Sequence, residues 1–245
     1  MRRVEIIEVI RRANQGVTRP YICRGDDDNI YFVKGKGASC RSLLCEWIAG
    51  KLALLLNVPI APFVIVDVPE ELLALQGGFD LSDLGSGPAF GSRECGVTEL
   101  AYSRINEIPE NLQKRVAAFD WWIHNEDRTL SFEGGNPNLF WDEVERKLVV
   151  IDHNQAFDTG FDATAFLAHH VFHQQFCLLQ ADPETQAMLR DMMLQALGSW
   201  HAIIQSVPDG WWYIDDEMTI PVGFDTEQTH QLLNRVADTN FWNSP

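Results

Sequence analysis

The spacing of apolar residues divides the chain into a strand-rich first part and a helical second part. Residues 21–24 and 30–34 are rich in β-branched and aromatic side chains, and the polar turn 25–29 between them predicts a hairpin. The apolar run 63–68 predicts a buried strand, whereas the run 4–10 fits a strand or a helix equally well.

Two segments in the first part of the chain have apolar residues at helical spacing. The first runs from Ser39 or Cys40 to Asn57 and is ended by Pro59, and the second runs over 110–124. The apolar positions that carry these predictions are 44, 47, 48, 52, 55 and 56 in the first helix and 112, 116, 119 and 123 in the second.

The order of the remaining segments indicates the fold class. Residues 137–141 and 147–151 predict a second strand pair, and the chain looks mostly helical from about residue 160 onward. Residues 76–97, rich in Gly, Ser and Asp, are the best candidate for a connection between two lobes. Strands first and helices later predict an α+β protein and not a regular βαβ alternation.

Composition restricts the class of protein and its compartment. With 245 residues, 46% hydrophobic and 22% charged, the chain can form a globular core, so disorder is excluded. No run of about 20 uninterrupted apolar residues is present, so we expect no membrane span. The N-terminus lacks an apolar signal core, and five cysteines without a C-x-x-C pair suit a reducing compartment. We therefore expect a cytoplasmic protein.

The net charge of −16 is unevenly distributed along the chain. Residues 1–51 contain ten Lys/Arg and six Asp/Glu, whereas residues 52–245 contain nine and 29. So acidic a surface repels polyanions, and we expect no direct nucleic-acid binding. A basic N-terminal segment followed by an acidic remainder suits a ligand that carries phosphates and metal ions together, although chance clustering would give the same pattern.

Three spots carry residue types that phosphoryl transfer needs. The first is Lys34 at a strand end, twelve residues before Glu46 on a predicted helix. A strand lysine can reach nucleotide phosphates, and a helix carboxylate can hold its ammonium in place. The alternative is that Lys34 only marks the strand end and that Glu46 is solvated.

The other two spots follow later strands and helices. Asp127, just past the second helix, can orient a hydroxyl group, and Asn136 or Asn138 can ligate Mg²⁺ through an amide oxygen. A polar surface loop with an Asp127–Arg128 pair is the alternative. Asp152 directly follows an apolar strand, where a carboxylate must be paired or hold a metal, unless it caps a helix.

These parts come in the order of a protein-kinase-like fold, and the chain resembles the HipA-like kinases, in particular short stand-alone HipA-like kinase domains. It is also distantly similar to type II phosphatidylinositol 4-kinases. The resemblance runs from about Asn14 to Phe157, and its most specific pieces are 120–129, 136–141 and 151–157. It implies a bilobal protein with a small antiparallel-sheet N-lobe and one helix over 1–90, and a mostly helical C-lobe over 91–245.

The resemblance also implies a role for each matching residue, with ATP and Mg²⁺ as cofactors. A loop over 16–20 would cover the phosphates, and the segment 88–91 would contact adenine. The residues it assigns are Gly16, Thr18, Lys34, Phe90 and Gly91 for ATP, Glu46 as the partner of Lys34, Asp127 as the catalytic carboxylate, and Asn138 and Asp152 as Mg²⁺ ligands. Asn138 is preferred to Asn136 because Leu139 and Phe140 follow it directly.

Two departures from the kinase pattern leave rival functions open. Asp127 and Asn138 are eleven residues apart, against about five in protein kinases. His153 and Asn154 stand where protein kinases have Phe-Gly. The main expectation is transfer to a protein Ser or Thr, including self, with a possible partner of the toxin–antitoxin type. A nucleotide-binding pseudokinase and an aminoglycoside-type small-molecule phosphotransferase are the alternatives.

Two further groups of residues are expected to be structural. The pattern His169, His170 and His173 places His169 or His170 near His173 on one predicted helix face, and a polar role in the helix or at a lobe interface is favoured over a metal site. The aromatic residues at 121, 122, 200, 211 and 212 are expected to fill the core of the helical lobe and its edges.

Overall fold

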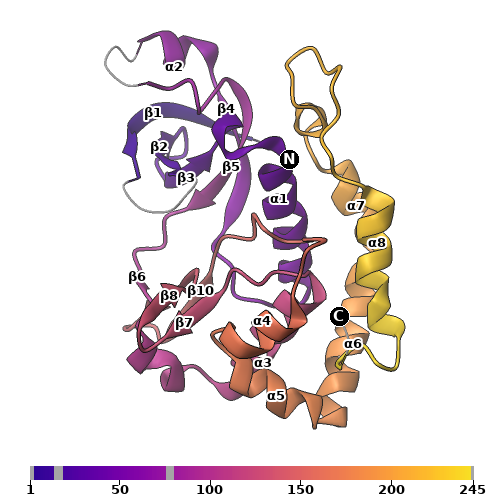
Figure 1. The fold of residues 1–245 in the computed structure, drawn as a ribbon. Coiled ribbons are helices and arrows are strands. Elements are labelled where there is room, and N and C mark those ends of the chain that lie inside the picture. Colours follow the sequence, from indigo (N-terminus) through magenta and orange to yellow (C-terminus); the bar gives the residue numbers. More distant parts are fainter. Residues whose placement is uncertain (1–2, 14–18, 76–79, 244–245) are drawn as a thin grey trace. The chain divides into compact units, whose positions relative to one another are not determined.

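Five strands of the first part of the chain close into a small barrel (Figure 1). The computed structural model describes residues 3–13, 19–75 and 80–243. The barrel order is β1-β2-β3-β5-β4, in which β1 and β4 pair in parallel and every other neighbouring pair is antiparallel. The strands are β1 (Val4–Arg12), β2 (Tyr21–Gly25), β3 (Ile30–Lys34), β4 (Phe63–Val68) and β5 (Gly87–Arg93). The opening run is therefore a strand, and the predicted hairpin and buried strand are confirmed.

The interior of the barrel is filled by alternate side chains of its strands, as the period of two requires. Tyr31 and Val33 of β3 are both buried, and they belong to one apolar cluster with Ile6, Cys23 and Val66. Burial raises the pKa of the Cys23 thiol to about 12, so this cysteine behaves as a small apolar residue.

The chain forms two compact units. The first contains Met1–Trp47, Ala61–Cys95 and Val207–Phe224, and the second contains Ile48–Ile60, Gly96–Ser206 and Asp225–Pro245. Of residues 76–97, in which we expected a connection between lobes, Gly87–Arg93 form strand β5. The boundary expected between residues 90 and 91 therefore lies inside a strand of the first unit.

A late segment of the chain completes the first unit. Residues Val207–Phe224 include the short 3₁₀ helix Asp209–Trp212, and they belong to the barrel unit although about 110 residues of sequence separate them from β5. The buried Trp211 donates its indole N–H to the Pro88 carbonyl of β5 at 2.9 Å and meets Trp47 edge-on. The aromatic cluster expected in the helical lobe is thus divided, because Trp211 packs with the barrel.

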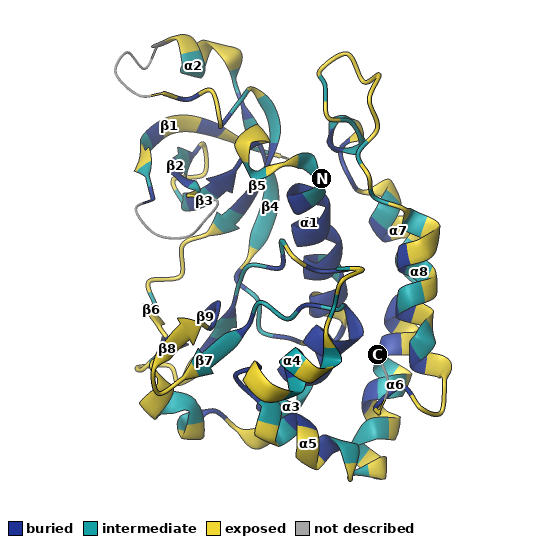
Figure 2. Ribbon diagram, in the orientation of Figure 1, coloured by how far each residue is buried: buried dark blue, intermediate teal, exposed yellow. Residues whose placement is uncertain are grey.

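Helix α1 (Cys40–Leu55) confirms the first predicted helix and contributes residues to both units. It is buried along nearly all of its length (Figure 2), as expected of a helix that is apolar on most sides. Helix α2 (Glu70–Leu75) follows β4 and was not predicted.

The second unit is mostly helical, as predicted. Its helices are α3 (Glu110–Trp122), α4 (Ala163–His169), α5 (His173–Gln180), α6 (Pro183–Leu197), α7 (Trp200–Gln205) and α8 (Thr226–Asn234). Trp121 and Trp122 of α3 are fully buried, and their indole N–H groups donate to the carbonyls of Phe241 and Leu233 at 2.9 and 2.8 Å. These bonds satisfy the only polar atom that each tryptophan takes into the core.

Small sheets accompany the helices of the second unit. Strands β9 (Leu139–Asp142) and β10 (Lys147–Val150) form the predicted antiparallel pair, and β6 (Thr98–Glu99) adds to β9. An additional hairpin of β7 (Thr129–Ser131) and β8 (Gly134–Asn136) occupies the segment between Asp127 and Asn138. A Cβ atom on Gly135 would lie 2.4 Å from the Thr129 carbonyl oxygen, so the close pairing of these strands requires glycine there. None of the helices in the described part of the chain is long and apolar enough to cross a membrane.

Candidate active site

The first unit holds Lys34 and Glu46 as a buried ion pair. Lys34 is the last residue of β3 and Glu46 lies on α1, and the Lys34 Nζ contacts Glu46 Oε1. Their side chains are only 10% and 3% exposed. A buried ion pair gains little net stability over apolar side chains, so its presence favours a role in binding or catalysis over a role in folding. The structure therefore brings together the two residues that the sequence pointed to.

The residues expected against adenine lie next to Lys34 in the sheet. Phe90 of β5 is the register partner of Lys34, and its buried ring stacks on Phe63 at 5.6 Å between ring centroids. A Cβ atom on Gly91 would lie 2.6 Å from Val66 Cγ1, so strand packing alone accounts for the glycine. Gly16 and Thr18, expected over the phosphates, lie outside the described residues.

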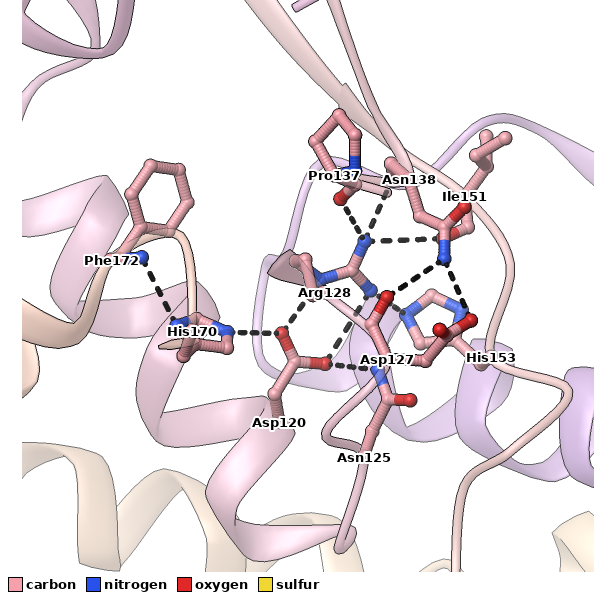
Figure 3. A network of polar contacts seen from close by, with 10 residues as sticks. All are labelled: Asp120, Asn125, Asp127, Arg128, Pro137, Asn138, Ile151, His153, His170 and Phe172. Atoms are coloured by element: carbon pink, nitrogen blue, oxygen red, sulfur yellow. Dashed lines mark hydrogen bonds and ion pairs between the residues drawn. The ribbon is translucent and has the colours of Figure 1, made fainter. Parts of the chain in front are cut away.

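The second unit brings Asp127 together with both candidate asparagines (Figure 3). The Asn138 Nδ2 lies 3.3 Å from Asp127 Oδ2 and 3.3 Å from the Asp127 carbonyl oxygen. The Asn136 Nδ2 lies 3.2 Å from Asp127 Oδ2. The eleven-residue spacing therefore does not separate Asp127 from Asn138, because the intervening residues form the β7–β8 hairpin, which brings the two ends of the segment together.

The electrostatics around Asp127 include the carboxylate of Asp152. Burial raises the pKa of Asp127, the negative charge of Asp152 raises it further, and the amides of Asn136 and Asn138 act in the opposite direction. Two like charges in one place favour the binding of a cation between them. Because the Asn138 Nδ2 is engaged by Asp127, its Oδ1 is the atom left for a cation. Carboxylate and amide oxygens are the ligands that Mg²⁺ prefers, so the donor set fits this ion.

Arg128 is not the surface partner of Asp127 that the sequence allowed; that alternative was wrong. Its side chain is fully buried, and its Nε donates to Asp120 Oδ2 at 2.7 Å (Figure 3). Asp120 is fully buried on α3, and its Oδ1 also accepts from the Asn125 Nδ2 at 2.8 Å. Burial alone raises the pKa of Asp120, but Arg128 and His170 outweigh it and hold that pKa well below its usual range.

His170 has a structural role in the same network. Its Nδ1 accepts from the Phe172 backbone N–H at 3.1 Å, so the proton sits on Nε2, which donates to Asp120 Oδ2 at 3.1 Å. Burial lowers the pKa of His170, which agrees with a neutral ring. Its neighbour His173 directs Nδ1 at the His170 carbonyl, 2.9 Å away, so both histidines have protein partners. Within the described ranges no cluster of three or more His, Cys, Asp or Glu side chains is arranged to hold a metal ion.

Sequence reasoning missed Asp120 as the partner of Arg128, although a signal was present. Asp120 is the single charged residue between Val116 and Ile123, where every other side chain is apolar. A carboxylate in the middle of an apolar run needs a buried partner, and Arg128, eight residues later, is the nearest cation that follows it.

Two comparisons with known proteins found relatives of this chain. A family model for HipA-like kinases matches residues 6–245. The crystal structure of a proinflammatory kinase from Helicobacter pylori, CtkA, matches with a TM-score of 0.54 at 11% sequence identity, covering 96% of this chain and 92% of that chain. At this identity the likeness shows a shared fold. No curated protein matches the sequence.

Proposed function

Because the chain belongs to the HipA-like kinase family, we propose that it transfers the γ-phosphoryl group of ATP to a hydroxyl group, with Mg²⁺ as cofactor. The observation that carries this proposal is the grouping of Asp127 with Asn138 beside the charge of Asp152. In phosphoryl transfer the protein mainly positions the reacting groups and neutralises the charge of the phosphates, and it contributes little covalent chemistry. An oriented carboxylate and oxygen ligands for a cation meet that need.

In this proposal the first unit supplies the cation that binds ATP. Lys34 would contact the α- and β-phosphates, and Glu46 would hold the ammonium in place. Since both side chains are largely buried, the lysine has few other orientations available, and the position of its charge is set before ATP binds. Phe90 and Gly91 would lie near adenine.

The second unit would supply the catalytic carboxylate and the metal ligands. Two amide groups bond one Asp127 carboxylate oxygen, and they fix its direction for orienting the acceptor hydroxyl. Asn138 Oδ1 and the Asp152 carboxylate would hold Mg²⁺. When bound, the ion neutralises negative charge on the phosphates.

The acceptor that suits these residues is a protein Ser or Thr, including one of this chain. The pseudokinase alternative drew its support from the long segment between Asp127 and Asn138. Contact between the two side chains despite that segment favours transfer instead. A small cationic acceptor remains the second candidate, because residues 52–245 contain 29 acidic against nine basic residues.

The test is transfer of labelled γ-phosphate from ATP in the presence of Mg²⁺. We expect self-labelling or ATP turnover by the wild type, and a loss on the order of 10²–10⁴-fold in Asp127→Asn at unchanged ATP affinity. Asp152→Ala should abolish turnover. Glu133→Gln, which removes one exposed carboxylate at the β7–β8 turn, is the matched control and should keep wild-type turnover.

Three results contradict the proposal in different ways. ATP binding without turnover, with a full panel of protein and small-molecule acceptors, would establish a pseudokinase. Turnover that survives Asp127→Asn would remove that residue from the mechanism. Absence of ATP binding in a folded wild type would show that the residues are wrongly assigned.

A further inference from the structure

One guanidinium group lies beside the backbones of Asn138 and Ile151 (Figure 3). The Arg128 Nη1 donates to the Asn138 carbonyl at 2.8 Å and to the carbonyls of Pro137 and Ile151 at 3.3 Å each. Ile151 directly precedes Asp152, and Arg128 directly follows Asp127. The three residues assigned to catalysis and metal binding are thus each within one residue of this hydrogen-bonded centre.

We infer that Arg128, held in place by Asp120, is the positioning residue that sets the distance between Asn138 and Asp152 and thereby the affinity for Mg²⁺. The inference rests on the proposed function and deepens it. Arg128 is fully buried, and it donates to the carbonyls of Asn138 and of Ile151, the residue before Asp152, so it would act through the backbone and not on the substrate.

Backbone conformation supports a positioning role. Asn138 has φ of 48° and Asp152 has φ of 56°, in the left-handed region that non-glycine residues seldom adopt. Such conformations persist only where surrounding contacts hold them. The bonds from Arg128 fall on the carbonyl of Asn138 and on the peptide that leads into Asp152, so they are placed to hold both. Without them we expect the two backbones to relax and the ligands to move apart.

The remaining donors of the guanidinium are used to fix its own plane. Its Nε and Nη2 both face Asp120, at 2.7 and 3.4 Å, and Nη2 also lies 3.4 Å from His153 Nε2. A planar group with five donors can serve a carboxylate on one side and carbonyls on the other, whereas the ammonium of lysine cannot. The site therefore requires arginine specifically.

The direct test replaces Arg128 by lysine and measures metal binding separately from turnover. Mn²⁺ binding is followed by electron paramagnetic resonance with a non-hydrolysable ATP analogue, and kcat, the KM for ATP and the Mg²⁺ requirement are measured with ATP. We expect Arg128→Lys to weaken Mn²⁺ binding and lower kcat by about 10–100-fold, as is usual for partners behind a metal ligand. The KM for ATP should stay close to the wild-type value.

His170→Gln is the matched control. It perturbs the same Asp120 carboxylate and lowers stability, but His170 has no bond to the carbonyls of Asn138 or Ile151 in the structure. We expect its Mn²⁺ affinity to match that of the wild type. If Arg128→Lys does not fold, Asp120→Glu keeps both charges and displaces the guanidinium, and the same loss of Mn²⁺ affinity is expected.

Distinct outcomes separate the inference from the function on which it rests. Wild-type Mn²⁺ affinity in folded Arg128→Lys or Asp120→Glu would overturn the positioning role and leave the kinase proposal intact. Equal losses of affinity in Arg128→Lys and His170→Gln would also overturn it, because general loosening would then explain both. Absence of Mn²⁺–nucleotide binding in the wild type would overturn the proposed metal site and the inference together.

Discussion

Replacing Asp120 by asparagine should destabilise the second unit more than any comparable change of one surface charge. The substitution keeps the size of the side chain and removes its negative charge. Asp120 is fully buried, and it faces Arg128, which is fully buried too, at 2.7 Å. By comparison, the buried pair of Lys34 and Glu46 keeps 10% and 3% of its side-chain surfaces exposed.

The expected magnitude follows from what the substitution leaves behind. Breaking a buried ion pair by removing one partner costs about 3–5 kcal/mol, because the other charge stays buried without compensation. His170 and Asn125 also donate to this carboxylate, and an asparagine oxygen can accept only part of that set. We therefore expect Asp120→Asn to lie toward the upper part of this range. Domains have total stabilities of about 5–15 kcal/mol, so the loss is a large share.

The assay is thermal and urea unfolding followed by circular dichroism and tryptophan fluorescence. For a chain of this size a loss of about 1 kcal/mol lowers Tm by about 2–4 °C, so a fall of roughly 6–20 °C is expected. Glu8→Gln is the control, because it breaks the exposed Arg24–Glu8 pair, whose side chains are 41% and 50% accessible. That substitution should change stability by less than about 1 kcal/mol.

A loss below about 1 kcal/mol in Asp120→Asn would refute the reasoning, since the Arg128 charge would then be neutralised in another way. A double-mutant cycle adds a second criterion. Asp120→Asn combined with Arg128→Met removes both charges, and it should be more stable than Asp120→Asn alone. A double variant that loses the sum of the two single losses would show that the pair is not coupled.

Three further predictions concern other parts of the molecule. Burial lowers the pKa of His124 to about 4. Below about pH 6.5 the unfolded state therefore binds a proton that the folded state does not bind, and the free energy of unfolding decreases as the pH is lowered. After discounting for partial exposure, this effect lowers the stability of the wild type by about 1 kcal/mol at about pH 5. His124→Asn should remove this effect, so its Tm should change less than that of the wild type between about pH 6.5 and about pH 4. An unchanged Tm profile would contradict the prediction. Trp211→Phe should lower stability by about 1 kcal/mol in urea unfolding, because the Pro88 carbonyl loses its donor, and no change would mean that water replaces the indole. Phe132, in the β7–β8 turn, is 89% exposed, so Phe132→Ser should leave the free energy of unfolding within about 0.5 kcal/mol of the wild-type value, and a large drop would mean that the ring is covered.

Local periodicity was sufficient for most of the secondary structure. The strands over 21–24, 30–34 and 63–68 and the two early helices were predicted from side-chain spacing, and the structure confirms them. Strand β5 was not predicted, because Gly87, Pro88 and Gly91 are typical of loops. Gly91 belongs in the strand for a tertiary reason, since a larger residue would meet Val66 on the neighbouring strand. Composition alone does not reveal such a contact.

The family could also be predicted from the sequence, because the order of the chemical residues along the chain is itself a sequence property. The pairing of those residues was only partly accessible. Lys34 and Glu46 were placed together by their kinase-like order, and the structure shows the pair. The contact of Asn138 with Asp127 was in doubt, because the spacing of eleven residues does not say whether the intervening segment folds back.

The sequence by itself determined which segments are strands or helices and which residue types are available for phosphoryl transfer. Only the tertiary structure decided that Arg128 pairs with Asp120 and not with its neighbour Asp127, and that one guanidinium joins the backbones of Asn138 and Ile151. The reason is physical. Strand and helix periodicities arise from neighbours along the chain, whereas the pairing of a buried charge depends on which side chains the folded core excludes from water together.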